Sequence, residues 1–463
     1  MLINFSVSNF LSFYEKQCFS MEAGKFRNHS SRLKKQGKYK LLKFMSIYGA
    51  NASGKTNLVS AMGVFRSIVI GSFKTGSYPM YCKVNEKYKE EPSSFEIKVL
   101  LDGKVYIYGF KAILSKSSFT EEWLYEELQN GSTKSVFKRD ISSEFFSLGE
   151  YINSNDLKER LSIYGEDIRS DSSVLFLKVM NQNKASLYQN KSKLDIFRNL
   201  YSWIKFKLDV NSPENPITNY SVLSNPEEIT KITQQLSEFE TGISKCKIVQ
   251  VPEEKIAASL PNDILKEIQH RLLEQRNQQV HSEKNIIPSV LIRQSDGSSL
   301  FIIELNSDGA YDYKTITFEH KNSNSIFSLA DESDGTIRLL DIIEILLTTE
   351  EEKVYVIDEI NRKFHPLLTK RFINEFLKLA ESRGIQLIVT THESQLMDLK
   401  LLRRDEICFV DKSLDGYSTI HSLDEYNVRF DKIIITEYLK GSYGAVPFKE
   451  EITKEKQYDN DFR

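Results

Sequence analysis

Residues 49–56 read Gly-Ala-Asn-Ala-Ser-Gly-Lys-Thr and satisfy the pattern G-x-x-x-x-G-K-[ST]. The apolar run Leu41–Tyr48 precedes them and has the composition of a buried strand, while Asn57–Ile70 has the periodicity of a helix. A chance match to the pattern is the alternative, and the strand before the loop and the helix after it argue against that. The segment therefore predicts an α/β fold with this loop at the carboxyl end of a strand.

The residue types of the loop suit a phosphate group. Glycine lets the backbone curl so that N–H groups point at a β-phosphate, and the following helix adds the partial positive charge of its N-terminus. Lys55 is expected to reach the β- and γ-phosphate oxygens, and Thr56 to offer its hydroxyl to Mg²⁺. ATP and Mg²⁺ are therefore the expected ligands. The residues predicted to hold the nucleotide here are Gly49, Asn51, Ala52, Ser53, Gly54, Lys55, Thr56 and Asn57.

A second apolar run, Val354–Ile357, leads directly into the carboxylates Asp358 and Glu359. A parallel sheet presents its ligand-binding groups at the carboxyl ends of its strands. We expect Asp358 to bind Mg²⁺, directly or through water, and Glu359 to be the base that orients the attacking water. Taken alone, two acids after an apolar run also fit an exposed turn, and the phosphate loop upstream favours the catalytic interpretation.

A third apolar run, Ile385–Thr390, ends in Thr391 and His392 after a helix-length stretch, Pro366–Arg383. The spacing fits a strand, helix, strand unit of a parallel sheet. His392 is therefore predicted to lie beside the γ-phosphate and sense it. A lone histidine after a strand also occurs without any such role.

The rest of the chain shows hairpin and helix signals. Asp-Gly pairs interrupt alternating apolar residues within Phe95–Leu114 and Ser298–His320, which predicts two antiparallel hairpins. Asp156–Leu208 and Asn262–Asn285 have the clearest helical patterns. At 463 residues, the chain is long enough for two domains or for one domain with an insertion.

Composition excludes several classes of protein. The net charge of -2, from 62 basic and 64 acidic residues, provides no whole-chain field for nucleic acid or a membrane surface. No run approaches the roughly 18 to 20 apolar residues of a membrane span, and Met1–Phe5 lacks a basic leader, so we expect a cytoplasmic protein without membrane contact. The four scattered cysteines have no zinc or disulfide spacing.

Several segments together resemble ABC-type ATPases of the RecF, SMC and OLD kind. Within that group the chain is most similar to the bacterial phage-defence ATPases of abortive-infection, Septu and PARIS-like systems. The resemblance covers roughly residues 1–125 and 295–448. Its markers are Ile3–Phe5 through Asn9–Phe13, the loop Gly49–Asn57, Glu332–Thr336, Asp358–Pro366, Thr390–His392 and Tyr438–Pro447.

The resemblance implies that Ser333, Asp334 and Gly335 act as the ABC signature, which contacts the γ-phosphate bound by a second protomer. Serine is a good helix N-cap, and a helix N-terminus favours anions. The catalytic unit would then be a dimer, alone or within a higher oligomer, with Asn361–His365 lining its seam. Without the resemblance, residues 331–336 read as a polar turn and helix cap.

Two departures from the family pattern are visible. The signature lacks the usual second glycine and glutamine, as in the defence subgroup, which argues against a transporter subunit. No glutamine lies between Asn57 and Leu101, so the glutamine that normally contacts magnesium has no counterpart there. Another group or water is expected to replace it.

The fold class implied is α/β, an ABC-type P-loop ATPase head with a mixed sheet and an antiparallel β lobe, interrupted by a mainly helical insertion. The expected divisions follow from the same motifs. They are 1–120 for the N-terminal half with the phosphate loop, 121–295 for the insertion, 296–448 for the C-terminal half, and 449–463 for a flexible tail.

Nuclease activity and direct DNA binding depend on different features of the sequence. OLD-type proteins carry a metal-dependent nuclease domain, but about seventy residues follow His392 and show no acidic cluster, so we expect no intrinsic nuclease. The basic run Arg32–Lys40 fits either a phosphate-contacting stripe or a solvated loop. Nucleic acid is therefore a possible partner that the charge does not indicate.

The main hypothesis is an ATPase that senses a trigger in phage defence and controls a separate effector, a toxin or nuclease. The alternative is an ATPase of DNA repair or chromosome handling that acts directly on DNA. A third is a nucleotide-gated scaffold without hydrolysis, for which Glu359→Gln would change nothing.

Overall fold

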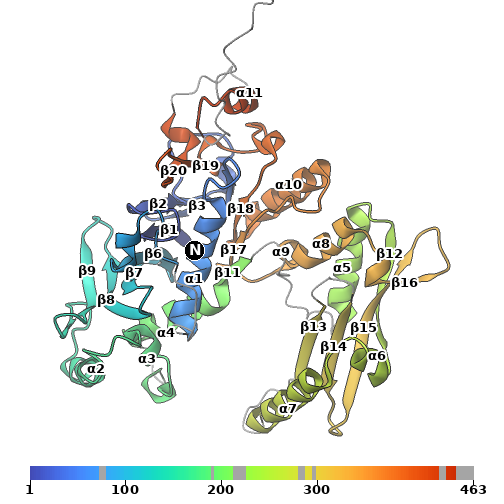
Figure 1. Cartoon of the computed structure of the whole chain (residues 1–463), viewed down its shortest axis with the longest axis horizontal. Helices are drawn as coiled ribbons and strands as arrows, with labels where there is room; N and C mark the ends of the chain where they lie inside the picture. Colours follow the sequence, from blue (N-terminus) through green and yellow to red (C-terminus); the bar gives the residue numbers. More distant parts are fainter. Residues whose placement is uncertain are drawn as a thin grey trace, which may run out of the picture. The chain divides into compact units, whose positions relative to one another are not determined.

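The computed structural model describes residues 1–71, 80–188, 192–211, 226–279, 287–294, 299–426 and 434–444. The tail expected at 449–463 lies outside these residues. The chain divides into two compact units, which are described separately (Figure 1). The first comprises residues 1–213, 350–360 and 377–463, and the second comprises residues 214–349 and 361–376.

The centre of the first unit is a six-stranded sheet in the order β11-β17-β18-β5-β19-β20. Its first five strands are parallel, and β20 pairs antiparallel with β19. The strands β5, β17 and β18 are fully buried, as expected for a sheet covered on both faces. Their bounds are β11 Leu208–Asn211, β17 Val354–Ile357, β18 Gln386–Thr390, β5 Phe44–Tyr48, β19 Ile407–Lys412 and β20 Ser418–Ser422.

A second sheet of this unit has seven strands in the order β10-β9-β8-β7-β6-β1-β2 and is antiparallel throughout. The predicted hairpin at 95–114 is confirmed, because Asp102 and Gly103 both have positive φ, 50° and 79°, and join β6 to β7. The bounds are β1 Leu2–Ser8, β2 Gln17–Ser20, β6 Ser93–Leu101, β7 Lys104–Ile113, β8 Ser118–Glu127, β9 Thr133–Asp140 and β10 Phe145–Leu148.

The helix α1 (Lys55–Gly71) packs between these two sheets (Figure 1). Its buried side chains, including Leu58, Met62 and Phe65, share one apolar cluster with strands of both sheets. The helix is apolar on more than one side because a sheet covers each of two faces. This packing fixes the start of α1, and with it the loop that precedes the helix.

Between the antiparallel sheet and β11, the chain is mostly helical, as the pattern of residues 156–208 predicts. The segment ends in a π-helical turn, η4, and returns to the parallel sheet as β11. The helices are α2 Asn155–Glu166, α3 Phe176–Val179, α4 Asp195–Ser202 and η4 Trp203–Lys207.

The second unit contains an antiparallel sheet in the order β12-β15-β14-β13, with β16 on β15. The hairpin predicted at 298–320 is confirmed by the pairing of β14 with β15 across Gly309, whose φ is 85°. Side chains of α6 and α7 form an apolar cluster with β14 and β15. The bounds are β12 Ile243–Gln250, β13 Ser289–Arg293, β14 Leu300–Leu305, β15 Tyr311–His320, β16 Ile326–Ser328, α5 Pro226–Glu238, α6 Glu253–Ala257 and α7 Asn262–Gln279.

The α/β class is confirmed, and the described part of residues 121–295, predicted as a mainly helical insertion, contains strands as well as helices. The segment mixes helices with strands, and the two units divide it at residue 213. Its first part completes the antiparallel sheet, because residues 118–127 pair with β7 and largely alternate between buried and half-buried side chains. This alternation with a period of two was not recognised from the sequence, because the stretch is rich in polar residues.

The remaining helices are α8 Asp334–Ile342, α9 Glu344–Leu347, α10 Pro366–Ser382 and α11 Ile434–Leu439. Short elements are β3 Lys34–Gln36, β4 Tyr39–Leu41 and the 3-10 turns η1 Ser30–Arg32, η2 Glu86–Lys89, η3 Ala185–Tyr188, η6 Leu329–Asp331, η7 Ser394–Leu396, η8 Arg404–Glu406 and η9 Leu423–Glu425. Across the described ranges, no helix is long and apolar enough to cross a membrane.

Candidate nucleotide site

Three of the predicted motifs meet at one edge of the parallel sheet. The phosphate loop (residues 49–56) follows β5, the acidic pair (Asp358 and Glu359) follows β17, and His392 stands two residues after β18. Because these neighbouring strands are parallel, their carboxyl ends lie at the same edge. All three motifs belong to the first unit.

Close packing of the backbone explains the two glycines of the phosphate loop. A Cβ on Gly49 would lie 2.4 Å from the carbonyl oxygen of Val410 and 2.4 Å from Ser53 Oγ. Gly54 has a φ of 115° and leaves room for the hydroxyl of Ser418, which a Cβ would approach to 2.5 Å. Both positions therefore exclude a side chain, and the loop can curl tightly.

Side chains far apart in the sequence support the loop from behind. Asn57 donates from Nδ2 to Ser12 Oγ at 2.7 Å, at the start of α1. The hydroxyl of Ser418 lies 2.8 Å from Ser12 Oγ and 2.5 Å from the carbonyl oxygen of Ser53. Ser12 lies in the Asn9–Phe13 marker, so that marker and Asn57 act here as a brace for the phosphate loop.

Lys55 is a buried cation at the start of α1, with an exposed fraction of 6%. Its Nζ donates to the carbonyl oxygens of Gly49 at 2.8 Å and Ala50 at 2.9 Å. Burial lowers the pKa of Lys55 to about 8, although the nearby carboxylates of Asp358 and Glu359 raise it. Because its hydrogen-bond partners are neutral carbonyl groups, the Lys55 ammonium is stabilised further when a negatively charged ligand binds beside it.

Thr390, the last residue of β18, connects the two members of the acidic pair. Its hydroxyl donates to Asp358 Oδ1 at 2.5 Å and accepts the main-chain N–H of Glu359 at 2.7 Å. Thr390 is fully buried, and Glu359 has a φ of 50°, in the left-handed region. The threonine therefore fixes the direction of the Asp358 carboxylate and the turn that presents Glu359.

Thr390 and Asn211 are site residues that the sequence reasoning missed. Asn211 ends β11, and its carbonyl oxygen accepts the main-chain N–H of Asp358 at 3.1 Å. The repeated hydroxyls before His392 were a signal for Thr390, because a buried strand rarely ends in two threonines without hydrogen bonds to make. The four-residue β11 gives no comparable signal.

His392 is exposed beside these groups, while the preceding Thr391 is buried. Partial desolvation and the positive charge of Lys55 lower the pKa of His392, against the opposing effect of Glu359 and Asp358. The ring is therefore biased toward its neutral form, which can donate or accept a hydrogen bond. The structure thus brings Lys55, the acidic pair and His392 into one electrostatic neighbourhood.

The site residues fit a magnesium-bound triphosphate. Ser53 Oγ is buried and has no hydrogen-bond partner among the described residues, which leaves a donor at the loop. Thr56 is exposed at the start of α1, and Asp358 is the acid fixed by Thr390. Mg²⁺ keeps several waters and takes few protein ligands, so these two oxygen-bearing side chains are the kind of ligand set that it uses.

The signature residues lie in the second unit, at the start of α8. Ser333 is the N-cap of this helix and accepts the main-chain N–H of Thr336 at 3.1 Å. The preceding Glu332 is tied to β15 by a 2.8 Å contact between its Oε1 and His320 Nε2. The predicted helix start is therefore present, and α8 presents its N-terminus from a braced position.

The loop after the acidic pair packs against the same helix start. Lys363 Nζ lies 2.7 Å from Asp334 Oδ1, and a Cβ on Gly335 would lie 3.3 Å from the carbonyl oxygen of Lys363. Residues 361–365 and the signature thus form one surface of the second unit. These are the two segments that the family resemblance assigns to a dimer seam.

The basic run Arg32–Lys40 divides into structural and solvated residues. Arg32 is buried, donates to the carbonyl oxygen of Leu401 at 3.0 Å and lies 3.4 Å from Glu406. Lys38 pairs with Glu127 at 2.7 Å. The side chains of β3 are exposed, so β3 leaves Lys34 and Lys35 as a short solvated strand and not as a built groove.

A known protein family matches most of the chain. Residues 44–398 match the family described as "AAA domain, putative AbiEii toxin, Type IV TA system". No match was found among curated proteins.

Solved structures of SMC head domains resemble the chain over most of its length. An SMC head bound to the C-winged helix domain of ScpA is 14% identical, with 91% of this chain and 97% of that chain covered and a TM-score of 0.41. The SMC head from Thermotoga maritima is 13% identical, with 91% and 98% covered and a TM-score of 0.35. A Pyrococcus furiosus SMC head with ScpA is 15% identical, with 91% and 96% covered and a TM-score of 0.41.

Proposed function

Because the chain belongs to the AAA-domain family of putative AbiEii toxins, we propose that it is an ATPase that binds ATP with Mg²⁺ and hydrolyses it. One observation carries the proposal. Lys55 begins the helix after β5 and the acidic pair follows β17, so both lie at the same edge of the parallel sheet, where the two carboxylates act to raise the pKa of Lys55. The groups that bind a phosphate and the groups that prepare water are therefore at one place.

The roles follow from the contacts of each residue. The loop N–H groups and Lys55 hold the phosphates, and Glu359, presented by the turn at Thr390, orients the attacking water toward the γ-phosphorus. His392, biased toward its neutral form, contacts the γ-phosphate region. Mg²⁺, held through Thr56 and Asp358, would neutralise phosphate charge when bound.

The second part of the proposal is that the site is completed by another copy of the chain. Ser333, Asp334 and Gly335 begin α8 in the second unit, together with the 361–365 loop. Capped by Ser333, α8 offers its N-terminus to an anion, which the γ-phosphate of a second protomer would supply. Hydrolysis then depends on assembly of at least a dimer.

The biological role that we propose is regulatory, in the cytoplasm. The family description names an abortive-infection toxin and a type IV toxin–antitoxin system. We infer that the chain senses a trigger in phage defence and controls a separate toxin or nuclease, without a nuclease activity of its own. The alternative, an ATPase acting directly on DNA, predicts that duplex DNA stimulates turnover.

Hydrolysis and assembly are tested together with Glu359→Gln. We expect the wild type to release phosphate from ATP, and Glu359→Gln to bind ATP without hydrolysing it and to accumulate as a dimer in light scattering. The double variant Lys55→Ala, Glu359→Gln is the control and should stay monomeric with ATP. A wild-type protein that neither binds nor hydrolyses ATP at any concentration tested would contradict the proposal.

The partner is tested in cells under phage challenge. Tagged Glu359→Gln should retain an effector that the double variant with Lys55→Ala does not retain, because only the first is held in the ATP state. Recovery of a toxin or nuclease supports the defence role. Stimulation of turnover by DNA, with no retained protein, favours the alternative.

A further inference from the structure

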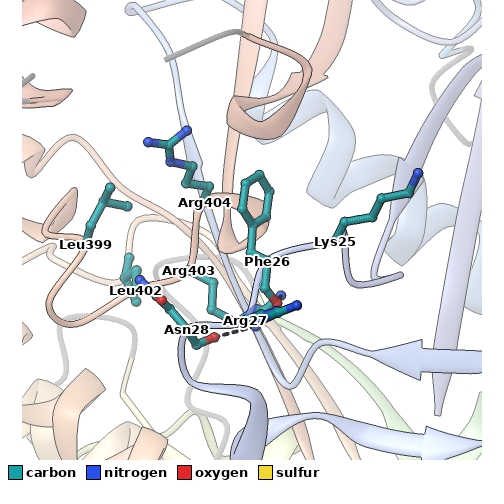
Figure 2. Close-up of a pocket in the computed structure, with 8 residues that line it drawn as sticks. All are labelled: Lys25, Phe26, Arg27, Asn28, Leu399, Leu402, Arg403 and Arg404. Atoms are coloured by element: carbon teal, nitrogen blue, oxygen red, sulfur yellow. Dashed lines mark hydrogen bonds between the residues drawn. The ribbon is translucent and has the colours of Figure 1, made fainter. Parts of the chain in front are cut away.

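A cationic cavity lies at the edge of the parallel sheet opposite the phosphate loop. Figure 2 shows the residues that line it. It has a volume of about 260 Å³ and lies between residues 25–28 and residues 399–404. Arg404 begins η8, which leads directly into the first residue of β19, whereas the phosphate loop follows the last residue of the parallel strand β5. The cavity is therefore separate from the nucleotide site.

Buried hydrogen bonds hold the cavity in shape. Arg403, with an exposed fraction of 1%, donates from Nε and Nη2 to the two carboxylate oxygens of Asp405 at 2.8 and 2.6 Å. The same guanidinium donates to the carbonyl oxygens of Phe26 and Asn28 (Figure 2). Asp405 also accepts the main-chain N–H of Gly24 at 2.7 Å. Residues 24–28 are thus a loop fixed before any ligand arrives.

The side chains that line the cavity are either positively charged or neutral. Four of its eight lining residues are cationic, namely Lys25, Arg27, Arg403 and Arg404, and none is acidic. The charge of Arg403 is matched by Asp405 behind the wall. Lys25 and Arg27 are exposed, so they are accessible to a ligand from solvent. In a chain with a net charge of -2, this concentration of positive charge is local.

Flat and apolar surfaces complete the lining. The Arg404 guanidinium carbon lies 5.7 Å from the centre of the Phe26 ring, and Leu399 and Leu402 face the same cavity (Figure 2). Aromatic rings and guanidinium planes both stack on nucleobases, and exposed basic side chains bind phosphate. A purely inorganic anion would make no use of the phenyl ring or the leucines.

We propose that this cavity binds a nucleoside phosphate, with the base against Phe26 and the phosphate at Lys25 and Arg27. The volume of about 260 Å³ is below the range of roughly 300 to 1,000 Å³ for drug-sized ligand sites, which suits one nucleotide unit. That unit is either a free nucleotide or the end of a single strand. Binding of a ligand in this cavity does not depend on ATP hydrolysis at the phosphate loop.

The test measures binding of dTMP by calorimetry and of a 5′-phosphorylated, fluorescent oligothymidylate by anisotropy, at low and moderate salt. A monophosphate lacks the β-phosphate that the phosphate loop holds, so the two sites are distinguished. The variant is Lys25→Ala with Arg27→Ala, and the matched control is Lys34→Ala with Lys35→Ala, two exposed lysines on β3. Phe26→Leu tests stacking, and thermal melts verify folding.

We expect the Lys25, Arg27 variant to lose about tenfold or more in affinity and its salt slope to fall by about 0.7, the value for one phosphate contact in a single strand. Phe26→Leu should lose about fivefold or more, and the lysine control should bind like the wild type. Binding of dTMP identifies a free nucleotide, and binding of the oligonucleotide alone identifies a strand end.

Three results would overturn the proposal. These are no binding of either probe at low salt, an equal loss in the Lys34, Lys35 control, and displacement of the oligonucleotide by an acidic peptide but not by dTMP. The last would show that the cavity recognises a protein partner.

Discussion

Lys55 is a buried cation whose hydrogen bonds go to neutral carbonyl oxygens of its own loop. Its pKa of about 8 lies below the ordinary value because burial outweighs the attraction of the acidic pair. A bound polyphosphate adds negative charge and must raise that pKa. Binding of nucleotide and protonation of Lys55 are therefore linked.

The sign of this linkage gives a pH dependence. Below about pH 8, Lys55 is already protonated and nucleotide affinity should be flat. Above that pH, binding must take up a proton, so affinity should fall with rising pH, by at most about tenfold per unit. Calorimetry between pH 7 and 9.5, in buffers of different ionisation enthalpy, measures both the fall and the proton uptake. Constant affinity across this range would show that Lys55 does not bind the nucleotide.

Thr390 gives a second prediction at the scale of single residues. Thr390→Val keeps the shape but removes the hydroxyl that holds Asp358 Oδ1 and the N–H of Glu359. We expect kcat for ATP hydrolysis to fall about tenfold to a hundredfold, with ATP affinity in the absence of Mg²⁺ changed less than threefold. Thr390→Ser should restore most of the activity. Equal losses in Val and Ser would indicate a packing role only.

Among the structural elements, the antiparallel sheet is joined to the start of α3 by one buried carboxylate. Glu122 on β8 accepts the main-chain N–H groups of Phe176 at 2.6 Å and Leu177 at 3.0 Å, and the hydroxyl of Tyr108 at 2.9 Å. Arg139 on β9 lies 3.9 Å away and donates to the carbonyl oxygen of Val174. A buried carboxylate with this many donors acts as a structural clamp.

Removing that carboxylate should be costly. Glu122→Ala leaves Arg139 and two buried main-chain N–H groups without the carboxylate that they contact. We therefore expect the free energy of unfolding to fall by about 3 to 5 kcal/mol. The neighbour Glu121 pairs with Lys111 on the surface, and Glu121→Ala should cost less than about 1 kcal/mol. Urea unfolding of the two variants measures the difference. Similar losses in the two variants would show that Glu122 stabilises the fold no more than the surface carboxylate of Glu121 does.

On the scale of the whole molecule, the residues assigned to the proposed active site belong to two different compact units. The phosphate loop, acidic pair and His392 belong to the first unit, and the signature belongs to the second. A site completed in trans has a consequence that no single variant reveals. Two chains inactivated in different units should complement each other.

Mixing Lys55→Ala with Ser333→Arg tests this. Each variant alone should be inactive, and an equal mixture should recover about one quarter of wild-type turnover, because half the dimers are mixed and each has one intact site. Ser333→Thr, which keeps a capping hydroxyl, is the control and should remain active. A mixture as inactive as its components would place the complete site within one chain.

Much of the fold followed from local pattern. The hairpins at 102–103 and 308–309 are confirmed by the pairing of their strands, and glycine in each Asp-Gly turn allows the positive φ that the turn needs. The strand β17 and the helix α10 begin at the residues that the sequence pattern indicates. The strands β8 to β10 were missed because their exposed faces are rich in charged residues, which a helix surface shares. Only the pairing of such a segment with neighbouring strands distinguishes a strand of this composition from a helix.

The sequence alone determined the chemistry of the phosphate loop and the acidic pair, because glycine, lysine and carboxylate at those spacings have few other uses. Tertiary structure decided what holds them, namely the threonine hydroxyl between Asp358 and Glu359 and the Ser12, Asn57 and Ser418 brace. It also formed the separate cavity beside Arg403. Hydrogen bonds between residues tens to hundreds of positions apart depend on how strands are ordered in a sheet. That order is set by packing of the whole core and not by any local run of residues.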